Sequence, residues 1–162
     1  GKADATPQSV ELNSIAKVSR AVYPPTEPYF VGEPDGPKHL YVMRLSCRAE
    51  HWCESGKDIP KGACIIKVGF SKSPRSRIRQ IQAAYPQGRF NWEIVHPDLI
   101  PKEAPYPDAK TAIAGEDAMK RFLAQKQSRI LGGEFFLATD SEINQAWKLG
   151  TNAATKSKRV EG

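Results

Sequence analysis

Residues 63–85, ACIIKVGFSKSPRSRIRQIQAAY, contain the transition that decides the fold. The first eight residues, 63–70, are rich in branched apolar side chains, which favour a β-strand. Further along, the apolar side chains of Ile78, Ile81 and Tyr85 recur at positions i, i+3 and i+7. This spacing is typical of one buried helical face, so the segment predicts a strand that leads directly into a helix.

Two other segments are typical of strands. Residues 39–45, HLYVMRL, are apolar and aromatic, and residues 90–95, FNWEIV, alternate apolar and polar side chains. A second long helix is predicted after the third strand. The apolar stripe expected to face inward consists of Ile113, Met119, Leu123 and Ile130. The basic side chains expected to face solvent on the same helix are Lys120, Arg121 and Lys126.

The order of these elements predicts an α/β protein of the α+β class. A short extended piece over residues 134–137 and a last helix over 141–149 complete the pattern. Each predicted element has one apolar face to bury, so a small antiparallel three-stranded sheet flanked by helices satisfies all of them. No Gly-rich phosphate loop accompanies the strands, which argues against a Rossmann or P-loop fold.

Three regions are expected along the chain. Residues 1–37 combine a short helix, over 9–22, with a proline-rich connector, and residues 38–150 form the folded domain. Residues 151–162, TNAATKSKRVEG, show no apolar periodicity and are predicted to be a flexible basic tail.

Composition restricts the class of protein. The 162 residues are 40% hydrophobic and 26% charged, as in globular domains, which argues against a disordered chain or a collagen-like fibre. The net charge of +6 favours an anionic partner such as nucleic acid. No apolar run is long enough to span a bilayer and no secretory pattern is visible, so a cytoplasmic protein is expected.

The cysteines allow two interpretations. Cys47, Cys53 and Cys64 are an odd number in a chain without a secretory pattern, which favours free thiols over a disulfide network. Together with His51 they also supply four side chains of the type that bind tetrahedral zinc. Their spacing is not that of paired C-x-x-C motifs, so free thiols are the preferred interpretation.

Glu116 shares one side of the predicted helix with Ile113, Met119 and Leu123. On that face the carboxylate would be buried and would need a cation, hydrogen bonds or a metal, because an isolated buried charge is costly. Alternatively, Glu116 lies in the first turn of the helix and faces solvent, stabilised by the helix dipole. Both readings stay open.

Two glycines interrupt predicted elements. Gly115 costs helix stability relative to alanine, which favours a close approach of another group to the backbone. Gly69 interrupts the strand that contains Lys67, where the missing side chain could admit a ligand or the next helix. Strand alternation places Lys67 on the face of Ile65 and Gly69, where exposure to solvent is the default expectation.

The segment FSKSPRSRIR, residues 70–79, concentrates positive charge around a helix start. Lys72, Arg75, Arg77 and Arg79 lie where free backbone N–H groups also favour phosphate, so they are candidate nucleic-acid contacts. A solvated basic face without a function is the alternative.

In the predicted strands and helices that contain Tyr41, Lys67, Arg77 and Glu116, the sequence resembles the GIY-YIG nuclease superfamily, in particular the branch typified by a phage T5 open-reading-frame domain. The motifs that support the resemblance, in chain order, are His39-Leu40-Tyr41, Lys67-Val68-Gly69, the arginine helix around Arg77, Glu116, and Gly133-Glu134-Phe135-Phe136. The pattern departs from the family where histidine replaces the first signature glycine, where lysine replaces the second signature tyrosine, and in a long insertion between the two signatures.

The resemblance implies a GIY-YIG-like fold and a Mg²⁺-dependent (or Mn²⁺-dependent) endonuclease that hydrolyses DNA, with RNA left open as a substrate. It implies that Tyr41 orients or deprotonates water, that Lys67 supports this step, that Arg77 neutralises phosphate and that Glu116 binds the metal. A further targeting domain or protein partner would select the target. Two alternatives stay open: a catalytically inactive nucleic-acid-binding module, and a protein-interaction domain without nuclease activity.

Overall fold

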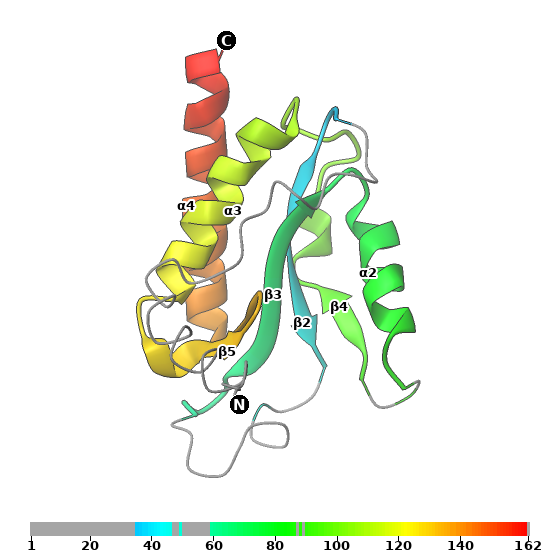
Figure 1. The fold of residues 1–162 in the computed structure, drawn as a ribbon, viewed down its shortest axis with the longest axis vertical. Coiled ribbons are helices and arrows are strands. Elements are labelled where there is room, and N and C mark those ends of the chain that lie inside the picture. Colours follow the sequence, from blue (N-terminus) through cyan, green and yellow to red (C-terminus); the bar gives the residue numbers. More distant parts are fainter. Residues whose placement is uncertain (1–34, 47–48, 50–58, 87, 89, 162) are drawn as a thin grey trace, which may run out of the picture.

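A computed structural model describes residues 35–46, 49, 59–86, 88 and 90–161. Its centre is a five-stranded antiparallel sheet in the order β4-β2-β3-β6-β5. One helix lies on one side of the sheet and two lie on the other (Figure 1). The strands are β2 (His39–Leu45), β3 (Cys64–Ser71), β4 (Trp92–Ile94), β5 (Ile130–Gly132) and β6 (Phe135–Ala138). The helices are α2 (Pro74–Ala83), α3 (Ala109–Leu123) and α4 (Asp140–Glu161), with 3-10 turns at Pro97–Leu99 and Gln127–Arg129.

The predicted α+β class is confirmed, but the three-stranded sheet is too small. The three predicted strands correspond to β2, β3 and β4, and β5 and β6 extend the sheet beyond β3. These two strands have three and four residues, too few to show a clear alternation. Gly132, the last residue of β5, and Gly133, in the turn that follows, have φ of 100° and 58°, a conformation that favours glycine. Only a short extended piece was expected there, and Ile130, assigned to a helical stripe, begins β5 instead.

Strand alternation divides the core into two layers. Leu40 and Val42 of β2 face α3 and α4, together with Ile66 of β3. Tyr41 and Met43 belong to the opposite layer, where α2 packs through apolar side chains. The period of two therefore decides which helix each side chain of the central strands can meet.

The helices α3 and α4 approach each other at glycines. A Cβ atom on Gly115 would lie 2.6 Å from Leu40 Cδ1 and 2.7 Å from the carbonyl oxygen of Gly150. A Cβ atom on Gly150 would lie 2.5 Å from Met119 Cγ. The close approach expected at Gly115 is thus made by the backbone of α4.

The last helix is longer than the sequence indicates. A helix over 141–149 and a flexible tail from 151 were expected, whereas α4 continues to Glu161. Ala146, Gly150 and Ala154, spaced four residues apart, are buried where the two helices meet. Small side chains at helical spacing produce little hydrophobic signal, although they allow tight helix packing.

Some expectations concern other parts of the chain. The N-terminal helix over 9–22, most of the connector, and Cys47, His51 and Cys53 lie outside the described residues. Cys64 is described and is a buried free thiol whose Sγ lies 3.4 Å from the carbonyl oxygen of Ala138. None of the helices in the described part of the chain combines the length and the apolar content of a membrane span.

Candidate active site

Lys67 lies where β6 begins beside β3. The pairing of β3 with β6 runs from Cys64 to Lys67, whose partner in the register is Phe135. Glu134 immediately precedes that partner, so the β5–β6 turn places its carboxylate next to the lysine. Lys67 Nζ donates to Glu134 Oε2 at 2.8 Å, and the lysine side chain is 12% exposed. The expected exposure of Lys67 is wrong, although its predicted strand face is correct.

Tyr41 lies beside Lys67 on the same face of the sheet. Its side chain is 1% exposed, and Lys67 Nζ lies 5.9 Å from the ring centroid. Gly69 is the register partner of Tyr41, and a Cβ atom on this glycine would lie 2.4 Å from the tyrosine hydroxyl oxygen. The space predicted at Gly69 is therefore filled by Tyr41 rather than by the next helix.

Glu116 reaches the same region from α3. It lies in the middle of the helix and is 2% exposed, so the buried reading is confirmed and the first-turn reading is wrong. Its Oε1 atom lies 3.5 Å from Lys120 Nζ, and Lys120 Nζ also donates to Glu134 Oε1 at 3.1 Å. Lys120 was expected to face solvent but is fully buried, because a residue four positions after Glu116 lies on the same helical face.

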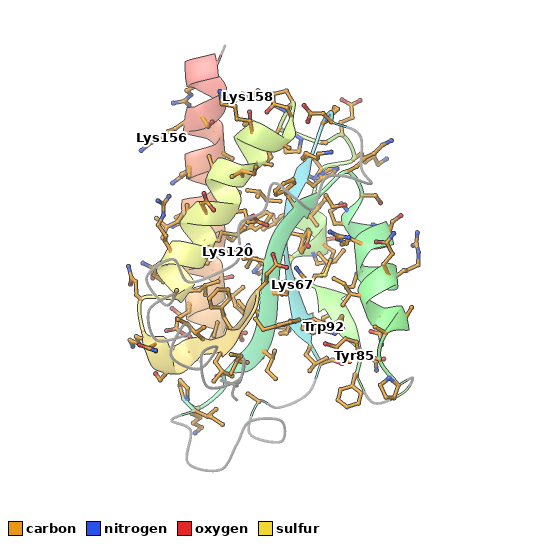
Figure 2. The ribbon with its side chains drawn as sticks, in the orientation of Figure 1. Lys67, Tyr85, Trp92, Lys120, Lys156 and Lys158 are labelled. Atoms are coloured by element: carbon orange, nitrogen blue, oxygen red, sulfur yellow. The ribbon has the colours of Figure 1, made fainter. Side chains whose placement is uncertain are left out.

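These contacts form a continuous ion-pair chain, defined here as Lys67–Glu134–Lys120–Glu116. Two ammonium groups and two carboxylates balance its charge. Figure 2 labels both lysines, with Lys67 on β3 and Lys120 on the α3 side of that strand. Elements from both sides of the sheet therefore meet in one electrostatic network, whose Lys67 end lies beside the ring of Tyr41.

The network perturbs the protonation of its members. Burial alone would lower the pKa of Lys67, but Tyr41 and then Glu134 outweigh burial and raise it. Burial alone would raise the pKa of Glu134, but Lys67 and then Lys120 outweigh burial and lower it. Glu116 also contributes to the raised pKa of Lys67, so these two residues interact electrostatically although no direct contact joins them among the ion pairs described.

Arg77 is the predicted catalytic residue that the described contacts do not bring into this cluster. It lies on α2, and its guanidinium donates to Gln80 Oε1 of the same helix at 3.4 Å. Ser73 caps the helix by accepting a hydrogen bond from the Ser76 backbone N–H, and Pro74 occupies the first turn. The predicted nucleic-acid contacts Lys72, Arg75 and Arg79 are all exposed around this helix start.

Two members of the cluster, Lys120 and Glu134, were not predicted as site residues. The spacing of Lys120 from Glu116 is a sequence signal for an ion pair, but the apolar stripe does not show that the lysine is buried. Glu134 belongs to the Gly133–Phe136 motif of the resemblance, which assigned it no role. Its position depends on the tight glycine turn between two very short strands.

The donor chemistry of the cluster fits a hard divalent cation. Glu116 and Glu134 provide carboxylate oxygens, and Mg²⁺ is commonly held by one or two carboxylates together with substrate phosphates. Lys120 is hydrogen-bonded or ion-paired to both carboxylates, so it would share their oxygens with a metal. Among the described residues, no three His, Cys, Asp or Glu side chains gather in a group that could hold a metal by themselves.

Chemically, the cluster combines a tyrosine hydroxyl, two ammonium groups and two carboxylates, of which Lys67 and Glu134 are partly buried and the others are buried. Such a set can orient a water molecule, stabilise negative charge and bind a cation. No protein-family model, curated protein or solved structure matches this chain. Function therefore has to be inferred from the site itself and from the motif resemblance.

Proposed function

We propose that this protein is a metal-dependent endonuclease that hydrolyses phosphodiester bonds in DNA. The observation that supports this most directly is the arrangement of Tyr41, Lys67 and Glu116, which come from three separate elements: Lys67 Nζ lies 5.9 Å from the ring centroid of Tyr41, and ion pairs through Glu134 and Lys120 connect it to Glu116. The motif resemblance assigned catalytic roles to these residues. A buried network of this kind is costly to build unless its charges are mutually compensated, and it is often kept for function.

The residues of the chain would divide the reaction as follows. The Tyr41 hydroxyl orients the attacking water, and the Lys67 ammonium, held by Glu134, stabilises negative charge that develops on the phosphoryl oxygens. Glu116, with Glu134 beside it, would hold Mg²⁺ or Mn²⁺, which supplies Lewis-acid neutralisation of phosphate charge. The role of Glu134 is to fix the position of Lys67, because its Oε2 atom accepts from the ammonium.

The basic start of α2 would bind the DNA backbone. Lys72, Arg75 and Arg79 are exposed there, and Arg77 on the same helix would neutralise phosphate charge. Phosphate contacts of this type orient the duplex without reading its sequence. A cytoplasmic location belongs to the same proposal and is in keeping with the free thiol of Cys64.

The test is incubation of the purified protein with supercoiled plasmid in the presence of Mg²⁺, Mn²⁺ or a chelator. Nicked or linear product is expected in the metal lanes only. Tyr41→Phe, Lys67→Met and Glu116→Gln should each remove most product, and Arg77→Ala should weaken activity through phosphate binding. Lys126→Met removes an exposed lysine and serves as the charge control. Circular dichroism of each variant establishes that it is folded.

A binding module without cleavage is the second candidate, and one observation favours it. Lys120 contacts both carboxylates, so the position suited to a divalent cation is already occupied by an ammonium group. This alternative expects DNA retention that weakens steeply with salt and no product with either metal. If the wild-type protein neither cuts nor retains DNA, both functions are wrong.

A further inference from the structure

Four aromatic side chains form a row on the α2 side of the sheet. Tyr85 lies 5.6 Å from Phe90 and 5.9 Å from Trp92, measured between ring centroids. Trp92 in turn lies 5.8 Å from Phe135, with the two ring planes inclined at 40°. These four residues, Tyr85, Phe90, Trp92 and Phe135, are called the aromatic row below.

The aromatic row ends at the candidate active site. Phe135 is the register partner of Lys67. The residue that precedes Phe135 is Glu134, whose carboxylate accepts the hydrogen bond from the Lys67 ammonium. Tyr41 and Trp92 belong to the same buried layer, and Tyr85, Phe90 and Phe135 pack against that layer. In Figure 2, Trp92 and Tyr85 lie on the α2 side of β3, close to each other and below Lys67.

The row is only partly buried. Trp92 is 7% exposed, whereas Tyr85, Phe90 and Phe135 each keep part of their surface accessible. Partly accessible rings in a row that ends beside a cationic group, here Phe135 beside Lys67, are a combination suited to unpaired nucleotides, because bases stack on rings while phosphates meet positive charge. The basic residues of α2, which ends next to Tyr85, add positive charge to the same side of the sheet.

We propose that the aromatic row stacks an unpaired base of single-stranded DNA next to the phosphate bound at Lys67. The preferred substrate is then a single strand or an unpaired segment, rather than an intact duplex. In a duplex the bases are already stacked on one another and cannot reach the rings without being extruded, which costs a few kcal/mol. This inference rests on the proposed function, because it names the form of nucleic acid that the same site would bind.

The test measures binding without cleavage, by fluorescence anisotropy in the presence of a chelator. Three labelled DNA probes are compared: a single strand, a strand of the same length with abasic residues at every position, and a duplex. The wild-type protein is expected to bind the single strand most tightly. Tyr85→Leu and Phe90→Leu, which keep an apolar side chain but remove the ring, should each weaken single-strand binding by about 5- to 100-fold and leave abasic binding unchanged.

Phe122→Leu is the matched control, because Phe122 is a partly buried aromatic residue in the layer on the opposite side of the sheet. It should bind all three probes as the wild-type protein does. Equal affinity of the wild-type protein for the single strand and the abasic strand, or unchanged binding by both ring variants, would overturn the base-stacking inference. Plasmid nicking that persists in that case leaves the proposed nuclease intact, whereas a wild-type protein that neither binds the probes nor nicks plasmid rejects both.

Discussion

Replacing Lys120 by methionine tests whether the ion-pair chain is as buried and as coupled as its geometry indicates. Lys120 is fully buried, and its Nζ atom lies 3.1 Å from Glu134 and 3.5 Å from Glu116. Methionine has a similar unbranched shape, so Lys120→Met removes the charge with little change in packing. Removing one partner of a buried ion pair typically costs about 3 to 5 kcal/mol.

The expected loss lies at the lower end of that range. Glu134 is 25% exposed and can recover hydration when the ammonium is removed, whereas Glu116 is 2% exposed and cannot. We therefore expect the free energy of unfolding to fall by about 3 kcal/mol. At roughly 2 to 4 °C per kcal/mol for a chain of this size, the melting temperature should fall by about 6 to 12 °C.

Urea unfolding followed by circular dichroism measures the loss of stability. The control is Lys126→Met, which removes an exposed lysine shortly after the end of α3. The control should change stability by less than about 0.5 kcal/mol. The double variant Glu116→Gln/Lys120→Met has no carboxylate charge at position 116 and should be more stable than the sum of the single effects predicts. A Lys120→Met protein as stable as the control, or single effects that add without coupling, would refute the buried ion-pair chain.

Three further predictions follow from particular contacts. Gly115→Ala should lower the free energy of unfolding by about 1 to 3 kcal/mol in a urea titration, because the new Cβ would collide with the Gly150 carbonyl, and an unchanged midpoint would contradict this packing. Because the pKa of Glu134 is lowered in the folded protein, its ionised carboxylate stabilises the fold above the ordinary pKa of the group, and this stability is lost as the pH falls through the lowered value. Between pH 5 and pH 3 the melting temperature of the wild-type protein should therefore fall more than that of Glu134→Gln. Equal falls in the two proteins would argue against the ion pairs of Glu134. Burial raises the pKa of the Cys64 thiol to about 11, so iodoacetamide at pH 8 should leave the Cys64 peptide unmodified in mass spectra of the folded protein, and modification as fast as in urea would disprove its burial.

Local patterns in the sequence predicted much of the framework. The apolar, aromatic and branched side chains of residues 39–45 and 63–70 predicted strands that correspond to β2 and β3, and the period of two assigned Lys67 to the face of Ile65. The helical spacing around Glu116 gave an inward position as one of two open readings, and the structure has the carboxylate buried. These predictions succeeded because the period of a strand or a helix depends only on backbone geometry, which neighbouring residues determine.

Local patterns were misleading where burial depended on distant partners. Lys120 resembles any solvated lysine in its helix, and the small residues Ala146, Gly150 and Ala154 resemble a weak helical segment followed by a tail. Both were misjudged because the side chains opposite them come from other elements. A charge can be buried when partners of opposite sign compensate it. Spacing within α3 indicates the pairing of Lys120 with Glu116, but not its pairing with Glu134, which comes from the β5–β6 turn.

The sequence by itself thus determined the central strands, the first described helix and the basic character of the α2 start, whereas the burial of Glu116, one of two open readings, was decided by the tertiary structure. Only the tertiary structure decided that the β5–β6 hairpin extends the sheet, that its turn delivers Glu134 to Lys67 and Lys120, and that Phe135 continues an aromatic row from Trp92. The physical reason is that periodicity is a property of one segment, whereas an ion pair or a ring contact is a property of two segments that packing brings together.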